Sequence, residues 1–195
     1  MLLKKGFSDA VRKARRAAAA RGRRLRIMFA DEARFGRINC PRPCWAPTEV
    51  RPKVASQLIR EFTYLYGAVS PKDGACCYLI MPAADTECFQ VFLDALAKKF
   101  PGQYIPLFLD GAGNHSGGNL VIPANIKLEF LPAYSPELNP QENLWDEIRE
   151  KFFKNYALKS MDEVYDKLEE AALYLERNAE LVKSTTSFSY IAKSF

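Results

Sequence analysis

Short apolar runs alternate along this chain with longer segments whose apolar residues recur at helical spacing. The short runs are rich in branched and aromatic residues, which favours β-strands. They occupy residues 25–31 (LRIMFAD), 60–70, 75–82, 104–110 (YIPLFLD) and 126–132. The second and third runs are separated by Pro-Lys-Asp-Gly, a typical turn sequence, and we therefore predict that they form an antiparallel hairpin.

Three longer segments, 85–100, 140–155 and 160–178, carry the helical pattern. Asp85 or Thr86 is the expected cap of the first helix, and a serine and a glutamate in capping-box register begin the third. We expect a further short helix between 114 and 120. Strands and helices in this order predict an α/β fold, a mixed sheet with helices packed on it. A chain of 195 residues forms one good core, so a single main domain is expected.

The N-terminal segment 7–22 also favours a helix, because it holds an alanine run and ends at a glycine. Its apolar face is thin, and we expect it not to pack deeply. The predicted organisation is a basic linker helix or arm at 1–24, the main domain at 25–180 and a C-terminal tail at 181–195.

Charge is distributed unevenly. Residues 1–26 hold ten of the 28 basic residues but only one of the 23 acidic ones. A basic arm on a mildly acidic body is a common footprint of DNA binding, because Lys and Arg displace counterions from phosphate. A solvated helix surface is the alternative. Arg23 and Arg24 are candidate DNA contacts in this arm.

Cysteine content and hydropathy indicate the compartment. Five cysteines, an odd number, suit a reducing environment, and no apolar run approaches the roughly 20 residues that span a bilayer. We expect a cytoplasmic protein with no membrane partner.

Three acidic residues stand at positions suited to chemistry. Asp31 and Asp110 follow apolar runs, and Glu142 falls in the first turn of a helix with Asn139 as its expected N-cap and Pro140 as its first residue. Strand ends of open α/β sheets gather ligands, and carboxylate oxygens are what Mg²⁺ prefers. Structural alternatives stay open from these residues alone: an aspartate commonly opens a turn, and Glu142 at the third helical position suits a capping role.

Three sequence blocks carry a family resemblance. FADEARFG (29–36), FLDGAGNH (108–115) and LPAYSPELNPQENLW (131–145) resemble the signature blocks of DDE transposases, in the bacterial insertion-sequence branch of the mariner-like superfamily. The third block is the most specific, and the resemblance spans about residues 25–155. It implies an RNase H-like fold with a mixed central sheet of about five strands flanked by helices.

The resemblance also implies a chemistry. Asp31, Asp110 and Glu142 would be the catalytic residues and the ligands of two Mg²⁺ or Mn²⁺ ions that drive DNA cleavage and strand transfer. The implied partners are DNA (transposon ends and target DNA), a second copy of the chain in a homodimer, and a helix-turn-helix domain from an upstream reading frame. The implied location is the bacterial nucleoid. Two alternatives are an RNase H-type nuclease that only hydrolyses, and a non-catalytic DNA-binding remnant of a transposon.

Further residues are candidate DNA contacts, and each has a structural alternative. The arginines suit phosphate binding or simple solvation, and the histidine suits a phosphate contact or a turn. The tryptophan, in a Pro-rich loop, suits a DNA or partner contact or a cover for the core edge. Tyr134 and Ser135 shape the loop before Glu142 or contact DNA. These candidates are Arg34, Arg37, His115, Trp45, Tyr134 and Ser135.

Overall fold

The computed structural model describes residues 2–39, 41–111, 120–132 and 135–193. Within these ranges the strands form one mixed sheet in which β5 is central and runs parallel to β1, β2 and β6. The strands are β1 (Arg24–Leu25), β2 (Met28–Ile38), β3 (Leu58–Val69), β4 (Cys76–Met81), β5 (Gln103–Leu109) and β6 (Ile126–Phe130). Strands β2, β3 and β4 pair antiparallel, which confirms the predicted hairpin at β3 and β4.

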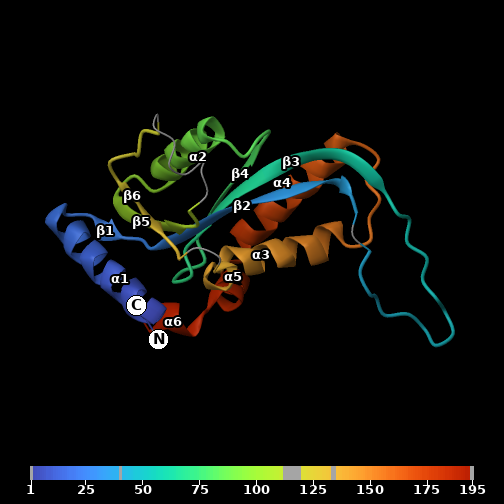
Figure 1. The fold of residues 1–195 in the computed structure, drawn as a ribbon, viewed down its shortest axis with the longest axis horizontal. Helices are drawn as coiled ribbons and strands as arrows, with labels where there is room; N and C mark the ends of the chain where they lie inside the picture. The colour runs from blue at the N-terminus through green and yellow to red at the C-terminus, as the bar shows by residue number, and fades with distance from the viewer. Residues whose placement is uncertain (1, 40, 112–119, 133–134, 194–195) are drawn as a thin grey trace.

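Helices cover both faces of this sheet (Figure 1). Helix α2 packs on one face, and α1 lies with α3, α4, α5 and α6 on the other. Their bounds are α1 (Leu2–Ala20), α2 (Thr86–Lys99), α3 (Gln141–Ile148), α4 (Met161–Arg177), α5 (Ala179–Thr186) and α6 (Ser189–Ala192). A 3₁₀ turn (Pro136–Leu138) precedes α3, and a π-helical turn (Arg149–Phe153) follows it. The short helix expected at 114–120 falls almost wholly outside the described residues.

Strand β2 separates two hydrophobic cores through its pleat. Met28 and Ala30 contribute to the core beneath α2, whereas Phe29, Ala33 and Phe35 contribute to the core beneath α3 and α4. This alternation follows from the period of two along a strand. We call the side of the sheet that carries the second core the α3 face.

Strand β2 is longer than predicted. We expected a strand that ends at Asp31, but β2 continues to Ile38 because it pairs with β3 from Phe29 to Ile38. The prediction that Asp31 closes a strand is therefore wrong. Polar residues after Asp31 obscure this extension in the sequence, since the hydrogen bonds that create it come from a strand about 30 residues away.

Helix α1 packs more deeply than its thin apolar face suggested. The Phe7 ring lies 4.9 Å from that of Phe108 and 5.2 Å from that of Tyr190, and Val11 is buried beside it. The expectation that this helix does not pack deeply is wrong, because small alanines on the same face let the helix approach the sheet.

The C-terminal segment is also different from the expected tail. Helices α5 and α6 continue the fold to Ala192, with Val182 and Ile191 buried in the core. The functional division of the chain at residues 24 and 180 stays a prediction. Among the described residues, no helix combines the length and apolar character needed to cross a membrane.

Truncating Phe7 tests whether α1 belongs to the core. We expect Phe7→Ala to lower the free energy of unfolding by about 3 kcal/mol, because a buried aromatic side chain leaves a cavity. Phe130→Ala, the same change at a half-exposed strand position, should cost less than about 1 kcal/mol. Urea unfolding followed by fluorescence measures both values, and equal losses would contradict the packed position of α1.

Candidate active site

The register between β2 and β5 brings two predicted acids to the same level of the sheet. Phe29 pairs with Phe108 in this parallel ladder, and both rings lie in the core on the α3 face, 5.3 Å apart. Asp31 stands two residues after Phe29, and Asp110 stands two residues after Phe108. Because side chains alternate with a period of two, this register directs both carboxylates toward the α3 face.

The third acid comes from helix α3, which begins against β2. Asn139 Nδ2 donates to the carbonyl oxygen of Ala30 (3.0 Å), and Asn139 Oδ1 accepts from the backbone N–H of Gln141 (3.2 Å). The helix begins at Gln141, one residue later than the sequence suggested. Asn139 thus ties the start of α3 to the residue before Asp31, and Glu142 lies in the first turn of that helix.

Burial and like charges disturb the ionisation of Asp31. Burial is the largest effect, and it raises the pKa of Asp31 to about 7. A hydrogen bond from Trp145 opposes this rise, and the charges of Glu142 and Glu32 add to it. The carboxylate therefore lies in a site that disfavours its negative charge.

Glu142 shows the same effects at lower strength. Burial raises its pKa, the positive charge of Arg149 opposes the rise, and the charges of Asp146 and Asp110 add to it. The charge of Glu142 therefore acts on Asp31, and the charge of Asp110 acts on Glu142.

Burial and neighbouring acids raise the pKa of Asp31 and of Glu142, and a divalent cation would offset this cost of their negative charge. The donor set consists of hard oxygens, as Mg²⁺ and Mn²⁺ prefer. Within the ranges that the structure describes, no three acidic, cysteine or histidine side chains are gathered closely enough to hold an ion as they stand. The residues fit a divalent metal in the chemistry of their donor atoms.

Trp145 is a residue of this site that the sequence analysis did not single out. Its indole Nε1 donates to Asp31 Oδ2 at 2.7 Å, and the side chain is only 1% exposed. Its position three residues after Glu142, on the same face of a helix, was an available signal. One helix thus carries both an acid and a partner for another acid.

Two arginines predicted to bind phosphate differ in their surroundings. Arg37 is engaged within the fold, since it donates to the carbonyl oxygen of Leu158 (3.0 Å) and pairs with Glu61 (2.7 Å). Arg34 is exposed, and its guanidinium lies over the ring of Phe62. Arg34 also lines a small hollow with Arg42, Arg149 and other residues beside the π-helical turn.

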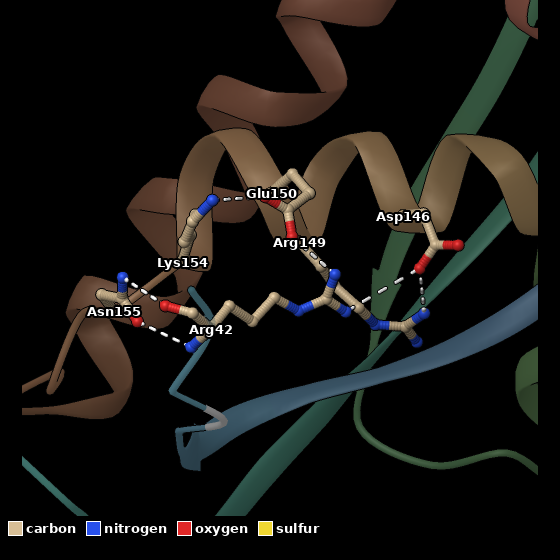
Figure 2. Close-up of polar contacts among 6 residues, drawn as sticks. All are labelled: Arg42, Asp146, Arg149, Glu150, Lys154 and Asn155. Carbon is tan, nitrogen blue, oxygen red and sulfur yellow. Dashed lines mark hydrogen bonds and ion pairs between the residues drawn. The ribbon is translucent and has the colours of Figure 1, made fainter. Parts of the chain in front are cut away.

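An extended arm, residues 41–57, projects from the body of the molecule between β2 and β3 (Figure 1). Figure 2 shows how Arg42 anchors the base of this arm to the body of the molecule. It forms an ion pair with Glu150 (2.5 Å) and a longer one with Asp146 (4.0 Å). The Asn155 side chain accepts from the backbone N–H of Arg42 (2.9 Å) and donates to its carbonyl oxygen. Trp45, further along the arm, is fully exposed, so covering the core edge is not its role here.

The other predicted contacts are distributed over the chain. His115 and Tyr134 lie outside the described residues. Ser135 is partly buried and starts the turn before α3, with its carbonyl oxygen accepting from Leu138. Arg23 is half-buried, and Arg24 is exposed.

Arg24 lines a cavity of about 630 Å³, formed where α1, β1 and the β3–β4 turn meet. Three further basic side chains, of Arg15, Arg26 and Lys72, share this cavity with Asp73. Of these, Arg26 is paired with Asp73 at 2.8 Å. The cavity reaches the amino end of β5 at Gln103, whereas Asp110 follows the carboxyl end of the same strand.

Comparison with known proteins identifies the family. The model of the DDE superfamily endonuclease family matches residues 26–165. The chain belongs to this family. The resemblance of the three sequence blocks to DDE enzymes is therefore confirmed, and the match includes Asp31, Asp110 and Glu142. A relative from Sinorhizobium fredii, the uncharacterized protein y4pE/y4sA, is 39% identical over 104 residues, which cover 53% of this chain and 77% of the relative.

Solved structures confirm the fold of this family member. A pre-cleavage Mos1 transpososome aligns with a TM-score of 0.60 and 15% identity, over 98% of this chain and 62% of that chain. A Mos1 mariner paired-end complex with Mn gives 0.60 and 16%, over 100% and 62%. The Mos1 catalytic domain alone gives 0.52 and 15%, over 100% and 94%. The predicted RNase H-like sheet is thus confirmed, and the chain spans 62% of the longer Mos1 chains.

Removing the Asn139 side chain tests its role in placing α3. We expect Asn139→Ala to lower the free energy of unfolding by about 1–3 kcal/mol, because the buried carbonyl of Ala30 loses its donor. Asn143→Ala is a matched control on the exposed side of α3, where the lost bond to Thr185 is replaced by water. Thermal and urea unfolding would compare the two variants. An Asn139→Ala protein as stable as the control would contradict this account.

Proposed function

We propose that this chain is the catalytic domain of a DDE transposase, which cleaves DNA strands and transfers them with divalent metal ions. The observation that supports the proposal is the register of β2 and β5, in which Asp31 and Asp110 each stand two residues after a paired phenylalanine, in a member of the DDE endonuclease family. Helix α3 begins against β2 and adds Glu142 in its first turn. An RNase H-like sheet shared with the Mos1 catalytic domain supports it.

The three acids are the proposed metal ligands. When bound, two Mg²⁺ or Mn²⁺ ions would activate an attacking oxygen and stabilise the leaving oxygen of a phosphodiester. Strand β2 holds Asp31 on a rigid element, the end of β5 presents Asp110, and α3 presents Glu142. Solved Mos1 structures include complexes with Mg and with Mn, which agrees with this choice of metals.

DNA is the proposed partner, both as transposon ends and as target. The cavity around Arg24 and the hollow beside Arg34 present basic side chains on the surface, where phosphates are bound through charge. The exposed Trp45 offers a flat ring for a base or sugar, and Ser135, Arg23 and Arg37 complete the proposed contacts within the described residues. His115 and Tyr134 are proposed from the family resemblance.

Larger assembly is part of the same proposal. By the family resemblance, we propose a homodimer on DNA and recognition of the transposon ends by a helix-turn-helix domain from an upstream reading frame. The similar solved structures include a Mos1 transposase paired-end complex with the left transposon end. The proposed domain organisation remains a basic arm to residue 24, a catalytic domain at 25–180 and a C-terminal segment after it, in a bacterial nucleoid-associated protein.

Loss of a proposed ligand tests the chemistry. We expect Asp110→Ala and Glu142→Ala to reduce Mn²⁺-dependent nicking and strand joining by at least about 100-fold, since even residues that only support metal ligands contribute 10–100-fold. Glu137→Ala changes an exposed acid in the turn before α3 and should retain activity. The substrate is plasmid DNA that carries the sequences flanking the gene, and the products are separated on gels.

The same assay separates the rival functions. Cleavage without joining by the wild-type protein would favour an RNase H-type nuclease. DNA binding without any metal-dependent chemistry in wild type or variants would favour a non-catalytic remnant. Full activity in Asp110→Ala would contradict the proposed triad.

Salt dependence tests the basic cavity. We expect Arg24→Ala to weaken binding to duplex DNA of any sequence and to reduce the slope of log K against log salt by about 1, because one phosphate contact is lost. Arg177→Ala removes an exposed arginine at the end of α4 and should leave the slope unchanged. Fluorescence anisotropy from low to high salt measures both, and identical slopes would place the DNA elsewhere.

A further inference from the structure

Trp145 is buried between the sheet and α3, where several rings fix its orientation. The Phe35 ring lies 6.2 Å away at 72°, and the Tyr78 ring lies 6.0 Å away at 62°. Edge-to-face contacts of this kind favour one ring orientation. With its indole 1% exposed, the side chain has little freedom to leave the position from which it contacts Asp31.

A glycine on β3 makes room for this ring. Gly67 is the residue that pairs with Asp31 across the β2–β3 ladder. A Cβ atom at this position would lie 2.6 Å from Trp145 Cη2 and 2.6 Å from the ring of Tyr78. Contacts that short do not occur, so any larger residue would displace a ring. The strand therefore carries a glycine opposite Asp31, although glycine weakens a strand interior.

The chemistry of the indole suits this partner. The indole N–H is a donor only, so it can bind a carboxylate but cannot itself accept a proton. It occupies Oδ2 of Asp31 at 2.7 Å and carries no charge. An arginine or lysine at this position would neutralise the carboxylate and repel a cation, whereas a neutral donor orients it and leaves its charge available.

We propose that Trp145 is a positioning residue: it holds the Asp31 carboxylate in the orientation that binds a divalent cation, and Gly67 provides the space for it. This inference rests on the proposed function, since it concerns how one proposed ligand is aimed. Trp145 acts through Asp31 and does not itself touch the metal. Because Glu142 lies one turn earlier on α3, a single helix presents one ligand and orients another.

Replacement of the indole N–H tests the inference. In the first variant, Trp145→Phe, the ring remains aromatic and the donor is lost. In the second, Trp145 is replaced by 3-benzothienylalanine, which keeps the shape of the indole with sulfur in place of N–H. Phe89→Leu is the control, because it loosens the separate core beneath α2. Calorimetric titration with Mn²⁺ measures affinity, and nicking at increasing Mn²⁺ gives the half-maximal concentration.

We expect both Trp145 variants to bind Mn²⁺ about 10–100-fold more weakly, as is usual when a residue that orients a metal ligand is lost. Nicking should recover part of its rate at high Mn²⁺, and Phe89→Leu should bind Mn²⁺ like the wild type. Wild-type affinity in the benzothienylalanine protein overturns this inference alone, even if Trp145→Phe fails to fold. A wild-type protein that binds no Mn²⁺ overturns the metal-site proposal, and this inference with it.

Discussion

The docking of helix α3 on strand β2 is the contact on which the candidate site depends. Two hydrogen bonds make it specific: Asn139 to the carbonyl of Ala30, and Trp145 to the carboxylate of Asp31. Leu144 and Ile148 add the apolar part of the interface, since both are fully buried. A shift of this helix would move Glu142 and would release the side chain that orients Asp31, so the geometry of two acids depends on one interface.

The same arrangement carries an energetic cost. Asp31 is largely buried beside other acids, and its raised pKa shows that the fold disfavours its charge. A chain selected only for stability would place a neutral residue there. The indole hydrogen bond offsets part of this penalty without supplying a counter-charge, and the proposed cation would offset the remainder. Carboxylates whose pKa is shifted by burial and by neighbouring charges are typical of functional sites.

Much of the fold could be predicted from the local sequence. The hairpin of β3 and β4, helix α2, the buried strand β5 and the strand β6 follow from apolar runs, turn residues and caps that lie within a few residues of each other. The length of β2 could not be predicted in this way, because its second half is held by pairing with β3. The packing of α1 was missed for a related reason: Phe7 finds its partners, Phe29 and Phe108, on strands that are remote in sequence.

For the site, the sequence by itself determined which residues are the candidates for the proposed chemistry. Asp31, Asp110 and Glu142 were recognisable because each stands in a motif whose neighbours repeat a family pattern. Only the tertiary structure decided how they are arranged. The β2–β5 register sets the two aspartates at the same level of the sheet, and α3 adds the glutamate. The tertiary structure alone also pairs Trp145 with Asp31 and places Gly67 next to the indole ring. The physical reason is that motifs are local, whereas a carboxylate's burial, orientation and charge neighbours come from segments that folding brings together.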